Sequence, residues 1–103
     1  MERTRANLSQ KLHQILGSNN VYFQPPNGTS IKYPCIIYHL EDDETFRADN
    51  INYVHNNRYT IRVIDKNPDS TIYKRLMDEF DHCSLDRKAI SDNLNHWYMT
   101  LYW

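Results

Sequence analysis

The spacing of apolar residues predicts a helix near the start of the chain, over about residues 3–16. Four apolar residues recur at the interval that places side chains on one side of a helix: Leu8, Leu12, Ile15 and Leu16. Gly17 follows directly, and a glycine in this position is typical of a helix C-terminus. We therefore expect an amphipathic helix whose apolar side packs against the rest of the domain.

Two later segments have the pattern of paired strands. Residues 33–40 are largely apolar, with Pro34 near the start, where a missing N–H does least damage to a sheet. Over residues 53–66 the alternation indicates a half-exposed antiparallel strand, with apolar Tyr53, Tyr59, Ile61 and Val63 against polar Asn56, Arg58, Thr60 and Arg62. We expect a hairpin, preceded by a short extended piece at residues 21–23 that the Pro25-Pro26 pair closes.

The predicted hairpin is too long to lie wholly on a small core. A strand over residues 53–66 would run to roughly 45 Å, whereas a globule of about 100 residues is near 35 Å across. The distal part, with a tip around Asp49-Asn50, is therefore expected to project as an arm or to be partly disordered. It begins with an acidic run that no small core could bury unpaired: Glu41, Asp42, Asp43 and Glu44.

A second helix is predicted from residue 67 to about Phe80. Asn67 is suited to the N-cap, Pro68 to the first helical position and Asp69 to the positive end of the helix dipole. Its apolar side is expected to consist of Ile72, Leu76, Met77 and Phe80. A weaker strand over residues 84–90 and a turn at residues 91–93 follow.

The C-terminal segment, residues 94–103, has the pattern of a strand with apolar character on both faces. One face carries Trp97, Met99, Leu101 and Trp103, and we expect it to belong to the core. The other face carries Leu94, His96, Tyr98, Thr100 and Tyr102. Apolar character on both faces indicates burial on both sides, so Tyr98 and Tyr102 are expected to contact another molecule. The segment ends on Trp103 without a polar tail, and we expect another copy or another protein to cover it.

Together these elements predict one α+β domain over residues 1–103. Its expected architecture is an antiparallel sheet of about four to five strands backed by two helices, with a long projecting β-hairpin. A chain of 103 residues and 12.4 kDa matches the usual size of a single domain.

Composition narrows the classes of function. A net charge of −1 and a pI of about 6.5 give no overall field that would attract nucleic acid or an anionic membrane. Eight tyrosines supply much of the apolar area, and tyrosine-rich surfaces are typical of interfaces. No apolar run approaches the roughly 20 residues that span a bilayer, and no signal peptide is evident. We expect a protein made in the cytosol that does not enter a membrane.

The cysteines and histidines match no known metal motif. Cys35 and Cys83 fit neither a disulfide framework nor a C-x-x-C motif, and we interpret them as buried thiols. Cys35 and His39 share one face of a strand and could collect around zinc with the His82-Cys83 pair, but this spacing is not that of a zinc site. The acidic run likewise lacks the alternating ligands of a calcium loop. We expect no metal and no cofactor.

Catalytic signatures are also missing from the sequence. It contains no G-x-S-x-G elbow and no glycine-rich phosphate loop. Asp92 and His96 could act as a carboxylate–histidine pair. A turn residue followed by a strand residue is the simpler interpretation, since Asp and Asn favour turns. We expect no enzymatic activity.

Five stretches, in this order and spacing, resemble small neck proteins of tailed bacteriophages, known as tail terminator or tail completion proteins. They are Val21-Tyr22-Phe23-Gln24-Pro25-Pro26, Lys32-Tyr33-Pro34-Cys35-Ile36-Ile37-Tyr38, Ala48-Asp49-Asn50, Val63-Ile64-Asp65-Lys66-Asn67-Pro68-Asp69-Ser70 and Asp92-Asn93-Leu94-Asn95-His96. The likeness spans about residues 21–103. Neither the N-terminal helix nor the acidic segment at Glu41 contributes to it.

The resemblance implies a structural virion protein without enzymatic activity. Such a protein forms a homohexameric ring on the last ring of tail-tube subunits, stops tube growth and makes the joint to the head connector. A sheath protein is a further candidate partner that the sequence leaves open. Assembly would take place in the host cytoplasm, and genomic DNA would pass through the lumen without specific binding. We expect the contacts to involve Tyr22, Phe23, Glu41, Asp42, Asp43, Glu44, Tyr98, Tyr102 and Trp103.

Two alternatives stay open. A connector-side head–tail joining protein would share the size, the ring symmetry and the lack of catalysis, but it would bind the portal complex instead of the tube. A small nucleic-acid-binding protein belongs to a different class and would need a basic stripe. The only candidate stripe is Arg58, Arg62 and Lys66 on one strand.

Overall fold

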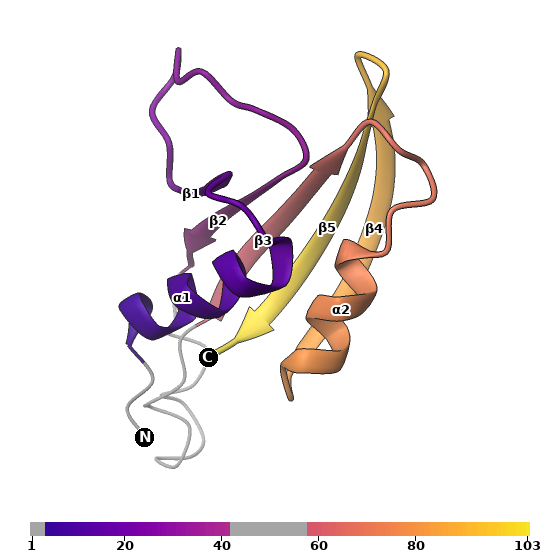
Figure 1. Cartoon of the computed structure of the whole chain (residues 1–103). Helices are drawn as coiled ribbons and strands as arrows, with labels where there is room; N and C mark the ends of the chain where they lie inside the picture. The colour runs from indigo at the N-terminus through magenta and orange to yellow at the C-terminus, as the bar shows by residue number, and fades with distance from the viewer. Residues whose placement is uncertain (1–3, 42–57) are drawn as a thin grey trace.

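The computed structural model describes residues 4–41 and 58–103 and has an α+β fold, a five-stranded sheet with two helices (Figure 1). The elements in chain order are α1 (Arg5–Leu16), β1 (Val21–Phe23), β2 (Cys35–Leu40), β3 (Arg58–Asp65), α2 (Ile72–Glu79), β4 (Cys83–Ser91) and β5 (Leu94–Tyr102). This order confirms the predicted one. The predicted projecting arm falls on residues that the structure does not describe, which include Asp42, Asp43, Glu44 and the predicted tip at Asp49-Asn50.

The strands lie in the order β1-β2-β3-β5-β4. β2 and β3 pair antiparallel, from Cys35 opposite Ile64 to Leu40 opposite Tyr59, which confirms that they are partners. β1 pairs parallel with β2, so the prediction of an antiparallel sheet was wrong at this edge. The physical reason is the loop over residues 24–34, which carries the chain back to the end of the sheet at which β1 began.

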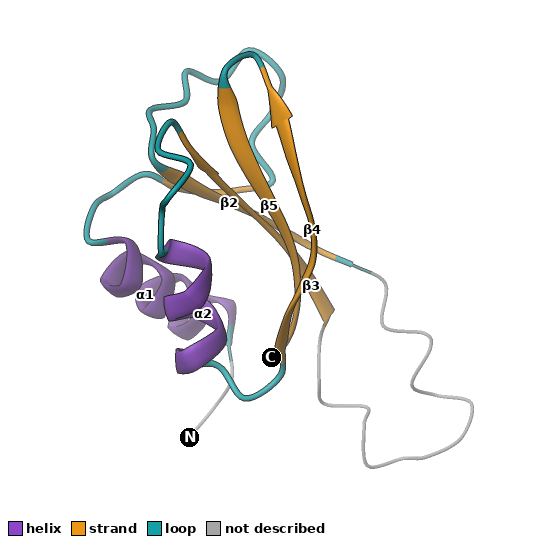
Figure 2. Cartoon of the chain, turned by 90° about the vertical axis from the view of Figure 1, so that its right-hand side faces the viewer, coloured by secondary structure: helices purple, strands orange, loops and turns teal. Residues whose placement is uncertain are grey.

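Both helices lie on the same face of the sheet (Figure 2). Leu8 and Leu12 of α1 are fully buried there, as the helical spacing predicted. The main core between the helices and the sheet also contains Ile36, Tyr38, Tyr59, Ile61, Val63, Ile72, Leu76, Phe80, Trp97, Met99, Leu101 and Trp103. The predicted core faces of β3 and β5 are therefore confirmed.

The ends of α1 follow from two residues of the sequence. The Thr4 hydroxyl accepts a hydrogen bond from the Asn7 N–H at 3.2 Å, which caps the N-terminus. Gly17 has a φ of 80° and its N–H donates to the His13 carbonyl at 2.8 Å. This left-handed conformation is easy for glycine because it has no Cβ, so Gly17 ends the helix as predicted.

The second helix begins later than the sequence pattern predicted. Residues 67–70 form a turn in which the Asn67 side chain accepts from the Asp69 N–H at 3.0 Å. α2 starts only at Ile72, with Thr71 before it. Asn67 has the chemistry of a cap, but it closes its own local turn instead of a helix. Met77 is 42 % exposed, so it lies outside the apolar side of α2, whereas Leu76 is fully buried.

Candidate interaction surfaces

The sheet face opposite the helices has none of the described helices on it (Figure 2). We call it the open face. The polar half of the strand alternation points to this side, and most of these side chains are half-buried. They include Arg58, Thr60 and Arg62 of β3 and His96, Tyr98, Thr100 and Tyr102 of β5.

An aromatic ring between two arginines lies at the centre of the open face. Tyr98 of β5 is the register partner of both Arg62 of β3 and Arg87 of β4. The Arg87 guanidinium carbon is 4.2 Å from the centroid of the Tyr98 ring, and that of Arg62 is 6.0 Å away. Both contacts are cation–π interactions. We call Arg62, Tyr98 and Arg87 the arginine–tyrosine row.

A β-bulge in β4 brings Arg87 to the open face. The register of β4 against β5 shifts between Leu85 and Arg87, so Asp86 is an extra residue. Before the bulge Leu85 pairs with Met99 on the helix-covered side, and after it Arg87 pairs with Tyr98. Strand side chains alternate, so without the extra residue Arg87 would point to the opposite face. The Asp86 carboxylate accepts a hydrogen bond from the Thr100 hydroxyl at 2.6 Å.

The arginines of the open face carry charge that the described residues do not balance. Within residues 4–41 and 58–103 the one salt bridge joins Lys11 to Glu79, at 3.2 Å. Arg58, Arg62 and Arg87 therefore have no carboxylate within 4.0 Å in this part of the chain. The Nε atoms of Arg58 and Arg62 are buried without a hydrogen-bond partner. The open face therefore carries three positive charges that no described carboxylate pairs.

His96 lies beside the row. Its ring stacks against Tyr98 with 6.2 Å between centroids, and both ring nitrogens are buried. Burial lowers the pKa of His96, and the positive charge of Arg62 lowers it further. The imidazole is thus held toward its neutral form.

A hollow of about 190 Å³ opens on the same face. It is lined by His39, Thr60, Arg62 and Tyr98. Glu41, a predicted contact residue, lies nearby because its carboxylate accepts a hydrogen bond from the Thr60 hydroxyl at 2.9 Å. Its backbone N–H donates to the Arg58 carbonyl at 2.8 Å. The other three acidic residues of the predicted site, Asp42, Asp43 and Glu44, lie outside the described residues.

One end of the open face has an apolar cluster of its own. Cys35, Ile37 and Ile64 are buried there, and Tyr22, Ile31 and Leu94 pack against them. The Tyr22 hydroxyl accepts a hydrogen bond from the Lys32 N–H at 3.3 Å. This second cluster explains why residues 33–40 are apolar on both sides.

The two predicted contact residues of β1 point in opposite directions. Tyr22 belongs to the cluster on the open face, whereas Phe23 packs against the main core beneath α1. The Phe23 ring is 4.9 Å from the Tyr38 ring, and the Arg5 guanidinium lies 4.3 Å from its centroid. A single surface could not use both side chains.

Trp103 is covered by its own chain, which corrects the expectation that another molecule must cover it. Its side chain is 5 % exposed and its ring meets the Phe80 ring edge-on at 5.6 Å. The indole N–H donates to the Thr4 carbonyl at 2.9 Å. The terminus thus docks between α1 and α2, and Trp103 is a core residue.

The residues considered for metal or acid–base chemistry are not assembled into a site. Cys35 is in the cluster on the open face, whereas Cys83 packs against the main core on the other side. Burial raises the pKa of each thiol to about 11. Within the described ranges no group of three or more His, Cys, Asp or Glu side chains is placed to hold a metal ion.

Asp92 is a turn residue and His96 a strand residue, which is the simpler of the two interpretations given above. Asp92 and Asn93 form the tight turn between β4 and β5, with φ values of 55° and 64°. In the described structure no hydrogen bond joins Asp92 to the imidazole, although the Asp92 charge acts to raise the pKa of His96.

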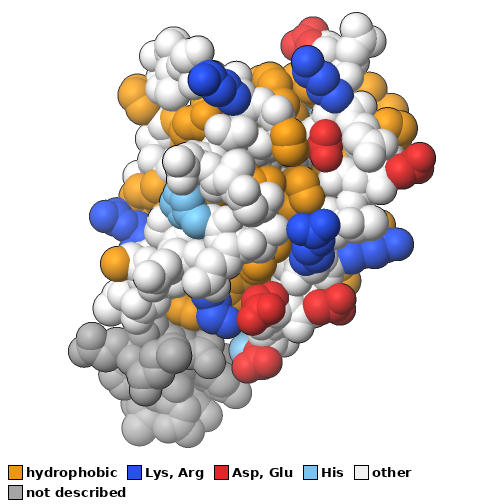
Figure 3. Space-filling view, in the orientation of Figure 1, with side chains coloured by type: hydrophobic (Ala, Val, Ile, Leu, Met, Phe, Trp, Pro, Cys, Tyr) orange, Lys and Arg blue, Asp and Glu red, His pale blue; other side chains and the backbone are white. Residues whose placement is uncertain are grey.

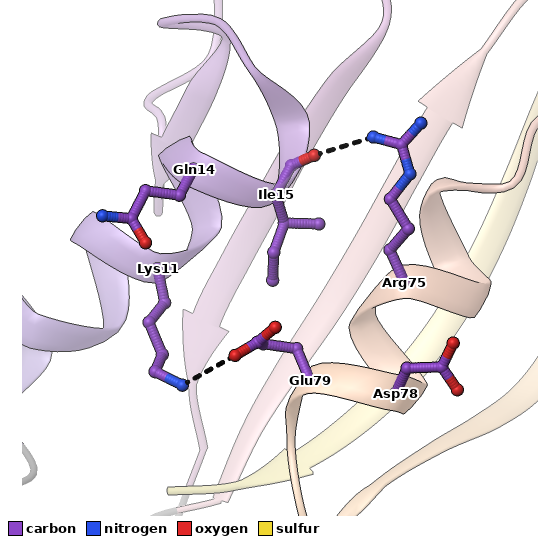
Figure 4. A pocket seen from close by; sticks show the side chains of 6 residues that line it. All are labelled: Lys11, Gln14, Ile15, Arg75, Asp78 and Glu79. Carbon is purple, nitrogen blue, oxygen red and sulfur yellow. Dashed lines mark hydrogen bonds and ion pairs between the residues drawn. The ribbon is translucent and has the colours of Figure 1, made fainter.

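A groove of about 360 Å³ separates the two helices (Figure 4). Lys11 of α1 bridges it to Glu79 of α2 at 3.2 Å. The Arg75 side chain donates to the Ile15 carbonyl at 3.1 Å, and this carbonyl belongs to the last turn of α1. These two contacts cross the groove and hold α1 and α2 together.

The C-terminal end of α2 has an exposed acidic patch, Asp78, Glu79 and Asp81. Acidic side chains gather over this end of the helix in Figure 3. The last turn of α2 has no basic residue. Negative charges at the negative end of a helix dipole are unfavourable.

The basic stripe predicted from β3 is replaced by a different set of residues. Arg58 and Arg62 point to the open face, but Lys66 lies beyond the end of β3 and is exposed. Arg87 of β4 takes its place, with β5 between the two strands. The only signal for this in the sequence is the pair Asp86-Arg87, which interrupts the alternation of β4.

No helix in the described part of the chain is long and apolar enough to cross a bilayer. Comparisons of the chain with models of protein families, with curated proteins and with solved structures found no match.

Proposed function

We propose that this protein is a structural subunit of a bacteriophage neck, a tail terminator that caps the tail tube as a homohexameric ring and forms the joint to the head connector. The proposal starts from the five sequence stretches that resemble this family in order and spacing. It needs no catalytic residue, metal or cofactor.

The observation that carries the proposal is the position of these stretches in the fold. Four of them meet at one end of the sheet, because Cys35 is opposite Ile64 and Ile64 is opposite His96. Asn95, which is 6 % exposed, donates from its side-chain amide to the Asp65 and Lys66 carbonyls at 3.3 Å each. The fifth stretch, residues 48–50, lies outside the described residues.

This arrangement supports the family likeness because the stretches come from distant parts of the sequence. Nothing in chain order alone requires them to form one end of a sheet. The buried Asn95 fixes the loop after β3 against the start of β5, so the two stretches form a common surface.

The side chains of the open face are a further argument for a subunit that assembles with other copies. Arg58 and Arg62 are half-buried and Arg87 is exposed, and none of the three has a carboxylate partner in the described part of the chain. A subunit in a ring has such a surface covered by a neighbour. The proposed partners are further copies of the chain, the tail-tube protein and the head-connector proteins, with a sheath protein as a further candidate. Genomic DNA passes through the lumen without specific binding.

The test is to mix the purified protein with the tail-tube protein of the same phage genome. Electron microscopy is expected to show a sixfold ring at one end of each tube and tubes that no longer lengthen. Tubes that continue to grow with no added density at either end would reject the proposal.

A connector-side joining protein is the alternative within the same class. The two roles are separated by presenting the protein with tail tubes and with DNA-filled heads in parallel. Binding to tubes supports the terminator role, and binding to heads alone supports the connector-side role.

A further inference from the structure

We infer that the open face of one copy binds the acidic patch at the end of α2 of a second copy. The two surfaces are the arginine–tyrosine row with Arg58, and the carboxylates of Asp78, Glu79 and Asp81. This inference rests on the proposed ring and names the contact that joins its subunits.

The open face supplies cations that are already positioned. Arg62 and Arg87 approach the Tyr98 ring from the two strands that flank β5, and their guanidinium carbons are 6.0 and 4.2 Å from its centroid. Two positive charges on one ring favour the approach of negative charge. A carboxylate that binds beside the ring would offset this charge and accept hydrogen bonds from guanidinium donors that the described residues leave unused.

The acidic patch supplies the matching anions. Asp78 and Glu79 are in the last turn of α2, where the helix dipole is negative, whereas Lys74 and Arg75 precede them. A helix is stabilised by acidic residues near its N-terminus and basic residues near its C-terminus, and α2 has the reverse order. Lys11 neutralises Glu79, and Asp78 and Asp81 have no basic side chain within 4.0 Å in the described ranges.

The positions of the two surfaces decide the symmetry of the contact. α2 packs on the same face of the sheet as α1 (Figure 2). The row lies on the opposite face, because Tyr98 alternates with the core residues Trp97 and Met99. A contact between different surfaces of identical chains is head-to-tail, and it closes into a ring when the rotation fits. A symmetric dimer through the open face would place arginines against arginines.

Single-stranded nucleic acid fits the open face less well. Sequence-independent binding relies on aromatic rings with a free side on which bases stack. The Tyr98 ring is already flanked by guanidinium groups from both neighbouring strands and by the His96 ring. The net charge of −1 also provides no general attraction.

The test exchanges the charges of the two surfaces in separate variants. One variant carries Arg62→Glu and Arg87→Glu, and the other carries Asp78→Lys and Asp81→Lys. Self-association is measured by analytical ultracentrifugation at low ionic strength over a wide range of concentration. Each variant alone is expected to associate about a hundredfold more weakly than the wild type, because like charges then meet.

An equimolar mixture of the two variants is expected to recover association. In the mixture each altered surface meets an altered partner of opposite charge, and each native surface meets a native one. The control variant carries Lys32→Glu and Lys66→Glu, which changes the net charge as the arginine variant does but at exposed residues away from the row. It is expected to associate like the wild type.

Thermal unfolding of every variant shows whether it folds. If the double arginine variant does not fold, Arg87→Glu alone serves, because Arg87 is exposed. A wild-type protein that stays monomeric at every concentration, or variants that associate like the wild type, would overturn the inference. Binding of a labelled single-stranded oligonucleotide that Arg87→Glu abolishes would assign the open face to nucleic acid instead.

The result of the charge exchange can be distinguished from the result of the tail-tube experiment that tests the proposed function. A ring that caps tail tubes but is insensitive to the charge exchange leaves the neck function standing and removes this contact. Recovered association in the mixture, together with no binding to tubes or heads, supports the contact and rejects the neck function.

Discussion

Trp97 and Tyr98 are neighbours in sequence with opposite surroundings. Trp97 is 2 % exposed and stacks on Tyr73, with 5.6 Å between ring centroids and 11° between planes. Tyr98 is half-buried on the open face between two arginines. The same strand therefore contributes one side chain to the core and the next to an exposed surface.

Trp97→Ala is expected to lower the free energy of unfolding by about 3–5 kcal/mol, because it removes a large buried side chain. The double variant Tyr98→Ala with Tyr102→Ala is expected to lower it far less but to weaken self-association. Denaturant titration and sedimentation measure the two effects. Equal losses of stability in both variants would show that the faces of β5 are assigned wrongly.

The lowered pKa of His96 makes stability depend on pH. The folded chain binds this proton less readily than the unfolded chain, in which the pKa has its ordinary value of 6.5. The contribution is therefore fully present above that value and is lost as the pH falls below it. Between about pH 8 and about pH 5.5 the wild type is expected to lose more stability than His96→Gln. Parallel pH dependence of the two unfolding curves would contradict this.

At this scale the sequence predicted the core better than the contacts. Alternation identifies Ile61, Val63 and Met99 as buried because each strand carries its own period. The contact of Tyr98 with Arg87 could not be predicted in this way, since it depends on which strand lies beside β5 and on the bulge at Asp86. The burial of Trp103 likewise depends on two helices packed over the C-terminus.

Among the elements, the β4–β5 hairpin depends most on individual backbone angles. Asp92 and Asn93 both have positive φ, which is the conformation of the two-residue turns that match the twist of a sheet. Asn tolerates this region better than residues with larger or branched side chains.

Asn93→Ala is therefore expected to destabilise the protein by about 1 kcal/mol, while Asn93→Gly is not. Thermal unfolding compares the two variants directly. A similar loss in both would mean that the Asn side chain, not the backbone angle, stabilises the turn.

The order of the elements could be predicted because each has its own periodicity and its own stop signal, such as Gly17. The start of α2 could not, because Asn67 favours a turn as readily as a helix cap. The parallel pairing of β1 was also hidden, since three residues carry no directional pattern. The candidate surface was predicted in part, through Tyr98 and Arg62.

At the scale of the whole molecule, the hydrogen bond between Glu41 and Arg58 indicates that the fold does not need residues 42–56. The Glu41 N–H donates to the Arg58 carbonyl at 2.8 Å, so β2 and β3 are already paired at this point. A chain that lacks residues 42–56, closed by a short turn, is expected to fold with nearly unchanged thermal stability. Under the proposed neck function it is also expected to fail in particle assembly. Loss of the fold would place the segment in the core, and infectious particles would remove it from the mechanism.

The bulged strand β4 has a further consequence for the solubility of the chain. β4 lies at the edge of the sheet, and a nine-residue edge could template further strands and lead to fibres. The extra residue Asp86 breaks the regular row of backbone groups, and Asp86, Arg87 and Lys88 place three consecutive charges in the middle of the edge. We expect copies to remain dissolved at high concentration and to meet only through side chains, so that their association can be reversed by salt.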